Sequence, residues 1–170
     1  MKIIPFIYDD VDELTSNTYL LIDSSNNSLI IDPGRDNQKI IDYIERNHLS
    51  LKGILLTHGH FDHIRGVDRI IDKFNIPCYI HFQDEIMLDD PSINGSISLF
   101  NEKVAVKHKC ETITDNDKIN LLDEEISVIA TPFHTIGSVC YYIKAEQILF
   151  TGDTLFKAGF GRYDLPHSDR

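Results

Sequence analysis

The sequence has no apolar stretch long enough to cross a bilayer, and it has few basic residues. A membrane-spanning helix needs roughly 20 consecutive apolar residues, and no run here approaches that length. The 16 Lys and Arg residues are outnumbered by 27 Asp and Glu residues, which gives a net charge of −11. This balance argues against nucleic acid or an anionic membrane as a partner. Because Pro5, Asp9 and Asp10 interrupt the N-terminus too early for a signal peptide, we expect a soluble, cytoplasmic protein.

Cysteine is scarce, and the chain shows no linker, repeat or low-complexity tract. The three cysteines stand at 78, 110 and 140, a spacing that matches no disulfide or zinc pattern. We therefore expect them to be buried and reduced, as in a reducing compartment. The uninterrupted composition, 42% hydrophobic, predicts one domain spanning residues 1–170.

Hydrophobic periodicity predicts a mixed α/β architecture in which helices cover a core of two sheet layers. The expected helices are 36–47, 64–74 and a short one at 83–88, and 91–98 is expected to be a loop. The expected strands are 18–22, 29–31, 54–56, 76–80, 104–106, 118–122, 126–129, 139–143 and 148–150.

One short segment, directly after the predicted strand 54–56, carries most of the chemistry. Its run T-H-G-H-F-D-H places His58, His60, Asp62 and His63 within six residues. His58 and His60 are two positions apart, so both rings can point the same way from an extended chain. Such a grouping of imidazoles with a carboxylate indicates a metal site. We also expect the positive end of the following helix to keep His63 neutral.

These donors are too many for one tetrahedral ion, so the segment predicts two ions side by side, with more ligands from elsewhere. Two later loops can supply them: T-P-F-H-T-I-G-S contains His134, and T-G-D-T-L-F contains Asp153. Each loop follows a predicted strand. Mixed nitrogen and oxygen donors suit zinc, with iron and manganese as alternatives.

The three motifs, in this order, resemble the metallo-β-lactamase superfamily. The chain is most similar to the glyoxalase II-like hydrolases of the short bacterial type, which carry a G-R-x-D-x-P segment after the aspartate motif. Here that segment is Gly161-Arg162-Tyr163-Asp164-Leu165-Pro166, and the runs N-T-Y-L at 17–20 and I-D-P-G at 31–34 also match.

The resemblance implies an αββα sandwich and a role for each ligand. His58, His60 and His134 would hold one ion, Asp62 and His63 the other, with Asp153 bridging both. Asp32 would steady the ligand loop without touching metal. Arg162 would hold an anionic substrate, unless it serves only as the structural partner of Asp164.

The chain departs from the family's pattern at its C-terminal end. The family supplies one more histidine from a P-G-H segment tens of residues later, and 170 residues do not reach it. His167 comes too early to replace that ligand. We therefore expect a fragment that lacks the last helix, strand and helix of the sandwich, with its second metal site one donor short.

The resemblance implies thioester hydrolysis by a metal-activated hydroxide, with Asp62 and Asp153 at the reacting centre and a small anionic thioester, of the lactoyl-glutathione type, as substrate. A persulfide dioxygenase with one iron on His58, His134 and Asp153 is an alternative, and a degenerate metal-binding module is another. Lactamase or lactonase activity uses the same scaffold, but the G-R-x-D segment points away from both.

Overall fold

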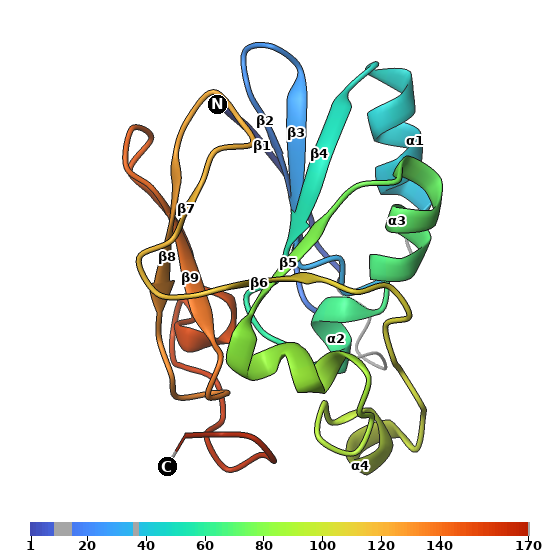
Figure 1. Cartoon of the computed structure of the whole chain (residues 1–170), viewed down its shortest axis with the longest axis vertical. Coiled ribbons are helices and arrows are strands. Elements are labelled where there is room, and N and C mark those ends of the chain that lie inside the picture. Colours follow the sequence, from blue (N-terminus) through green and yellow to red (C-terminus); the bar gives the residue numbers. More distant parts are fainter. Residues whose placement is uncertain (9–14, 36–37, 170) are drawn as a thin grey trace.

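The computed structural model describes residues 1–8, 15–35 and 38–169, which form two facing β-sheets with helices on one side (Figure 1). The larger sheet has six strands in chain order: β1 (Lys2–Phe6), β2 (Thr18–Ile22), β3 (Asn27–Ile31), β4 (Ser50–Leu55), β5 (Cys78–His81) and β6 (Glu111–Ile113). The smaller sheet has the order β10-β9-β8-β7, with β7 (Lys118–Ile119), β8 (Ile126–Ala130), β9 (Val139–Ile143) and β10 (Ile148–Phe150).

Helices α1 (Gln38–Arg46) and α3 (Val67–Phe74) lie on the outward face of the larger sheet, where Figure 1 shows them beside β4. Helix α2 (Phe61–Ile64) precedes α3, and α4 (Ser96–Phe100) lies at the bottom of this view. There are also two 3₁₀ segments: η1 (Phe82–Leu88) follows β5, and η2 (Gly152–Thr154) follows β10 of the smaller sheet. Among the described residues, no helix covers the outward face of the smaller sheet. Within the described ranges, no helix is both long and apolar enough to cross a membrane.

The apolar side chains on the two faces of the larger sheet form two separate hydrophobic cores. Successive side chains of a strand point to opposite faces. On β3, for example, Ile30 packs beneath the helices, whereas Leu29 and Ile31 pack between the two sheets. Strand β9 closes the second core with Tyr141, which is fully buried and donates its hydroxyl proton to the Leu56 carbonyl at 2.7 Å. Both faces of the larger sheet are therefore covered, which explains its nearly continuous apolar runs.

Most predicted elements are present, and the expected α/β architecture with two sheet layers is confirmed. The hairpin of β2 and β3, and the strands β9 and β10, lie where the sequence predicts them. Helix α1 matches its prediction, of which positions 36 and 37 lie outside the described residues. Cys78, Cys110 and Cys140 are buried and unpaired, as expected.

Three local predictions are wrong. The single helix over 64–74 is broken, because the Gly66 N–H donates to the Pro33 carbonyl at 2.7 Å instead of continuing a helix. The loop over 91–98 ends in α4, whose start is held by the buried Asn94 side chain accepting the Ser96 N–H. Residues 104–106 form no strand, since the Val106 N–H donates to Leu88, and β6 lies further along the chain.

Candidate metal centre

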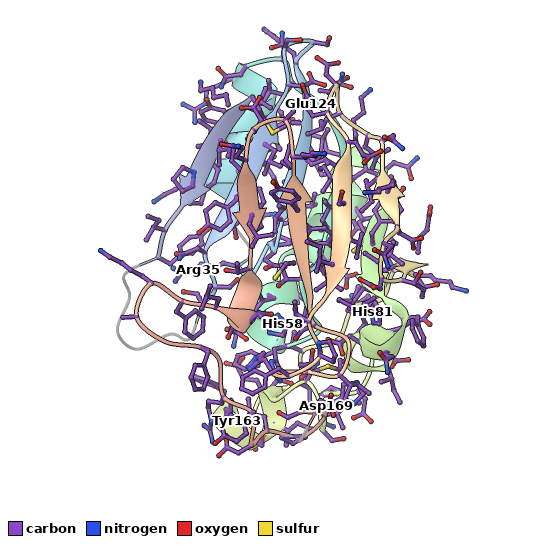
Figure 2. All side chains as sticks on the ribbon, turned by 90° about the vertical axis from the view of Figure 1, so that its left-hand side faces the viewer. Arg35, His58, His81, Glu124, Tyr163 and Asp169 are labelled. Atoms are coloured by element: carbon purple, nitrogen blue, oxygen red, sulfur yellow. The ribbon has the colours of Figure 1, made fainter. Side chains whose placement is uncertain are left out.

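Side chains that could bind a metal follow the carboxyl ends of strands from both sheets. Asp32 follows β3, His58 lies in the loop after β4, His134 lies in the loop after β8, and Asp153 lies in η2 after β10. Figure 2 shows His58 below the ends of these strands. Carboxyl ends of neighbouring parallel strands meet at one edge of a sheet, where open α/β folds place their ligands. Sequence-distant motifs are thus brought to one place.

The first donor group consists of His58, His60 and His134, whose facing atoms all lie within 4.8 Å of one another. All three rings are buried. His60 Nδ1 lies 2.8 Å from His134 Nε2, although the two residues are 74 positions apart. The structure therefore brings together the three histidines that the sequence assigns to one ion.

Hydrogen bonds on the far side of two rings set which nitrogen is free. His134 Nδ1 donates to the Arg162 carbonyl at 2.6 Å, so its Nε2 keeps a lone pair. The Thr57 hydroxyl gives its proton to Asp32 Oδ2 at 2.7 Å and therefore accepts from His58 Nδ1 at 3.1 Å. His58 Nε2 is left with its lone pair directed into the group. Such outer contacts orient metal-binding imidazoles.

The group fits a transition-metal ion. His58 Nε2 is buried and has no hydrogen-bond partner among the described residues, an arrangement that a metal–nitrogen bond would satisfy. Burial and the neighbouring histidines lower the pKa of His60 to about 3 and that of His58 well below its usual value. Both rings are therefore neutral at pH 7, the form that binds metal.

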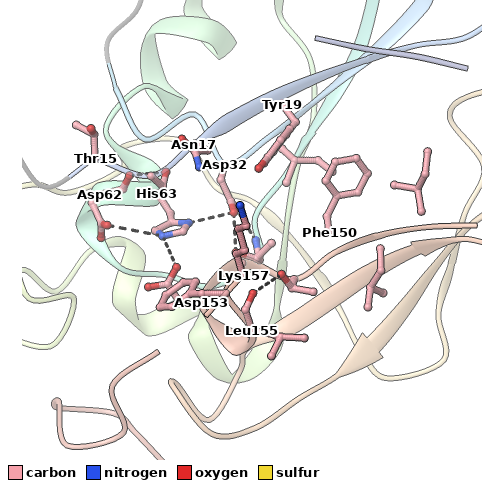
Figure 3. Close-up of a pocket in the computed structure, with 18 of the residues that line it drawn as sticks. Thr15, Asn17, Tyr19, Asp32, Asp62, His63, Phe150, Asp153, Leu155 and Lys157 are labelled. Atoms are coloured by element: carbon pink, nitrogen blue, oxygen red, sulfur yellow. Dashed lines mark hydrogen bonds and ion pairs between the residues drawn. The ribbon is translucent and has the colours of Figure 1, made fainter. Parts of the chain in front are cut away.

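A second donor group, His58, His63 and Asp153, shares the His58 ring with the first. Figure 3 shows His63 between Asp62 and Asp153: His63 Nε2 lies 3.3 Å from Asp153 Oδ1 and 3.7 Å from Asp62 Oδ2. The other oxygen of Asp153 lies 3.6 Å from His134 Nε2. One carboxylate therefore faces both groups, the place that the resemblance gives to a bridging ligand. Asp62 is buried beside the second group but lies outside its three close donors.

The expectation that a helix end keeps His63 neutral is wrong. His63 lies in the last turn of the four-residue helix α2, among carboxylates. Burial alone would lower its pKa, but Asp32, Asp62 and Asp153 outweigh that effect and hold the pKa of His63 well above the usual value. A metal ion at His63 would therefore displace a proton.

Asp32 lies beneath both groups, where it accepts two hydrogen bonds and forms an ion pair. The hydrogen bonds come from the Thr57 N–H at 2.8 Å and the Thr57 hydroxyl at 2.7 Å, and Asp32 Oδ2 pairs with His63 Nδ1 at 3.0 Å. The carboxylate thus orients His63 directly and His58 through Thr57, which the sequence analysis does not anticipate. Thr57 directly precedes His58, and that adjacency is the signal that could have revealed it.

The backbone and the side chain of Arg162 form hydrogen bonds with different residues. Its carbonyl accepts from His134, as described above, and its exposed guanidinium donates to both oxygens of Asp164 at 2.9 and 3.1 Å. The pairing with Asp164 that the sequence offers as an alternative is therefore present. The guanidinium makes that pair in solvent beside the site.

A cavity of about 760 Å³ opens beside the second donor group. Asp62, His63 and Asp153 line its polar wall, and β10 with Leu155 lines an apolar wall (Figure 3). Its size is in the range of small-molecule sites. A small substrate could thus bring a reacting bond against the donor groups while its apolar part rests on β10.

Comparison with known proteins identifies the family of the chain. The sequence profile described as Metallo-beta-lactamase superfamily matches residues 11–170. A probable metallo-hydrolase, YqgX of Bacillus subtilis, is 39% identical over 155 residues, covering 91% of this chain and 73% of its own length. A hydroxyacylglutathione hydrolase of Buchnera aphidicola is 38% identical over 145 residues, covering 85% of this chain and 49% of its own length. The crystal structure of BLEG-1, a B3 metallo-beta-lactamase, superposes with a TM-score of 0.90 at 35% identity over 99% of this chain and 79% of that one. The chain belongs to the metallo-β-lactamase superfamily.

Proposed function

We propose that this protein is a metal-dependent hydrolase of the glyoxalase II type, which splits a small anionic thioester into a carboxylic acid and a thiol. The observation that carries the proposal is the pair of donor groups joined by the His58 ring, with Asp153 facing both. Zinc is the metal we propose, because four imidazoles and two carboxylates suit it. The similarity to a hydroxyacylglutathione hydrolase supports the thioester as substrate.

The chain's own residues would hold and orient the reactants. His58, His60 and His134 would hold one ion, and His63 and Asp153, with Asp62 beside them, the other. When bound, two such metal ions lower the pKa of a water molecule between them and polarise a substrate carbonyl. In the reaction, a carbon–oxygen bond forms, the carbon–sulfur bond breaks, and the thiolate takes up a proton.

Asp62 is suited to accept the proton of the attacking water. Burial raises the pKa of Asp62 above the usual aspartate value, more strongly than nearby His63 lowers it. A carboxylate with a raised pKa is a better base at neutral pH than an ordinary one. Asp62 lines the cavity with its Oδ2 3.7 Å from His63 Nε2, and we propose that it contacts the attacking water there.

The proposal predicts thioester hydrolysis by the zinc-loaded protein. We expect release of thiol from S-lactoylglutathione, measured with a thiol-reactive dye, at a rate at least about 100-fold above that of chelator-treated protein, because the ions supply several kcal/mol of transition-state stabilisation. A β-lactam and a glutathione persulfide, the latter with iron-loaded protein and an oxygen electrode, serve as comparison substrates. Faster turnover of either one would assign the site to that chemistry and contradict the proposal.

Arg162 is proposed to attract the anionic end of the substrate by exchanging Asp164 for a substrate carboxylate. Arg162→Ala is then expected to raise KM roughly tenfold or more with kcat little changed, since a charge-assisted contact contributes about 1.5–3 kcal/mol to binding. Asp164→Ala, which frees the guanidinium, is the matched control. It should leave KM unchanged or lower it; an equal rise in both variants would show that the ion pair is only structural.

A further inference from the structure

Asp84 is a completely buried carboxylate that no metal-site motif contains. It lies in η1, after β5, and its relative exposure is 0%. Burying a charged group is costly unless hydrogen bonds replace the lost water. The hydrogen-bond donors to Asp84 therefore show which segments of the chain the carboxylate connects.

The donors to Asp84 come from both loops that carry the first donor group. Oδ2 accepts the Gly59 N–H at 3.0 Å and the Thr135 hydroxyl at 2.6 Å, and Oδ1 accepts the Gly137 N–H at 2.8 Å. Gly59 stands between His58 and His60, and Thr135 follows His134. His167 Nε2 adds a contact to Oδ1 at 3.4 Å while donating to the Gln83 carbonyl at 2.8 Å.

Glycine is required where the loops meet this carboxylate. A Cβ atom on residue 137 would lie 2.4 Å from Asp84 Oδ1, and one on residue 59 would lie 2.5 Å from Met87 Cβ. Side chains at these positions would push η1 away from the loops. The glycine of H-G-H thus serves close packing on η1, and its backbone φ is not positive.

The two ligand loops need such a link. Their strands are joined by the Val139 N–H to Thr57 carbonyl bond at 2.9 Å, which lies before the first histidine. Beyond it, His60 and His134 approach to 2.8 Å between ring nitrogens. Because His134 Nε2 carries a lone pair, this contact is a hydrogen bond in which His60 Nδ1–H donates. An ion bound to both rings would replace that proton, so a rigid connection beside the rings is needed to keep the loops together in both states.

We infer that Asp84 is a positioning residue that sets the separation of His58, His60 and His134 before an ion binds. The inference rests on the proposed metal centre, but not on the reaction catalysed there. Asp84 belongs to neither donor group, so it acts through the loops. Asparagine cannot replace it, because an amide offers one acceptor oxygen, and its NH₂ group would face at least one backbone N–H.

The test compares Asp84→Asn with Asp23→Asn. Asp23 is also buried, at 7% exposure, and accepts the N–H groups of Ser25 and Asn27 at 2.9 and 2.8 Å. It also accepts the Asn27 side-chain amide at 2.9 Å and the Asp123 N–H at 3.1 Å. It lies in the β2–β3 turn, at the opposite end of the sheets from the centre (Figure 1). Both variants lose a buried, hydrogen-bonded carboxylate, but only one touches the ligand loops.

Three quantities are measured for each protein: thermal stability in chelator, affinity for Co²⁺ by competition, and the visible absorption spectrum of bound Co²⁺. We expect both variants to lose stability. Only Asp84→Asn should bind Co²⁺ roughly 10–100-fold more weakly, as losses of outer contacts do, with an altered spectrum. Wild-type affinity and spectrum in Asp84→Asn would overturn the inference while leaving the centre intact. No Co²⁺ binding by the wild type would overturn the centre itself.

A milder variant keeps the test decisive if Asp84→Asn does not fold. Thr135→Val removes one donor to Asp84 and keeps the shape of the side chain. We expect it to weaken Co²⁺ binding several-fold, whereas unchanged binding in a folded Thr135→Val protein would contradict the inference.

Discussion

Replacing His58 with alanine is expected to lower zinc affinity at least about 100-fold, more than the loss of an outer contact does. His58 is the ring shared by both donor groups, so one substitution removes a ligand from each. Its Nε2 is also a buried nitrogen without a hydrogen-bond partner in the described part of the chain. Zinc per chain, measured by plasma emission spectrometry after dialysis against one fixed zinc concentration, should fall several-fold below that of the wild type.

His108→Ala is the control for this experiment. His108 Nε2 pairs with Asp72 at 2.7 Å on α3, away from the donor groups, so its removal should leave zinc content unchanged. Equal zinc in His58→Ala and wild type would mean that the ion lies elsewhere, and the proposed centre would then be wrong. Equal loss in both variants would point to surface-bound metal.

The location of this centre could be predicted because its ligands are concentrated in sequence. T-H-G-H-F-D-H places four donors beside each other, and an apolar strand before it is a local signal. His134 and Asp153 can be identified as candidate ligands only from the order of the three motifs along the chain. Their approach to His58 depends on the pairing of β8, β9 and β10 and on how the two sheets face each other, which no local pattern encodes.

Asp84 illustrates what sequence reasoning misses. A lone aspartate after a short strand is indistinguishable from a surface residue, since its importance comes from donors 25 to 53 positions away. Strand β6 escaped prediction for a related reason: Glu111 and Thr112 are exposed, so only Ile113 carries an apolar signal. Contacts between distant segments decided both features.

The protonation of His63 was predicted wrongly because local helix geometry was weighed without its tertiary neighbours. A four-residue helix has only a small dipole, whereas Asp32 approaches His63 Nδ1 to 3.0 Å from another strand end. The same carboxylates that favour the protonated ring would neutralise the charge of an ion bound there. Charge balance at the second group is therefore set by three aspartates from three separate motifs.

Asp153→Asn is expected to reduce thioester hydrolysis at saturating zinc by at least about 100-fold and to leave roughly one ion per chain. Asparagine keeps the size of the side chain but removes its charge and one of the oxygens that face His63 and His134. The first group keeps its three histidines and should still fill. The second keeps fewer donors, and without its ion the attacking water is less acidic and the carbonyl less polarised.

The rate loss in Asp153→Asn should appear in kcat, because Asp153 acts where charge develops and not where the substrate is recognised. The control is Asp42→Asn, whose carboxylate accepts only the Gln38 amide on the surface of α1 among the contacts described. Zinc titration and thiol release are measured on the same samples. Two tightly bound ions together with a wild-type kcat in Asp153→Asn would show that Asp153 does not bridge the groups. One ion with a wild-type kcat would show that the first group alone supports the chemistry, because His58, His60 and His134 would then suffice to activate the water.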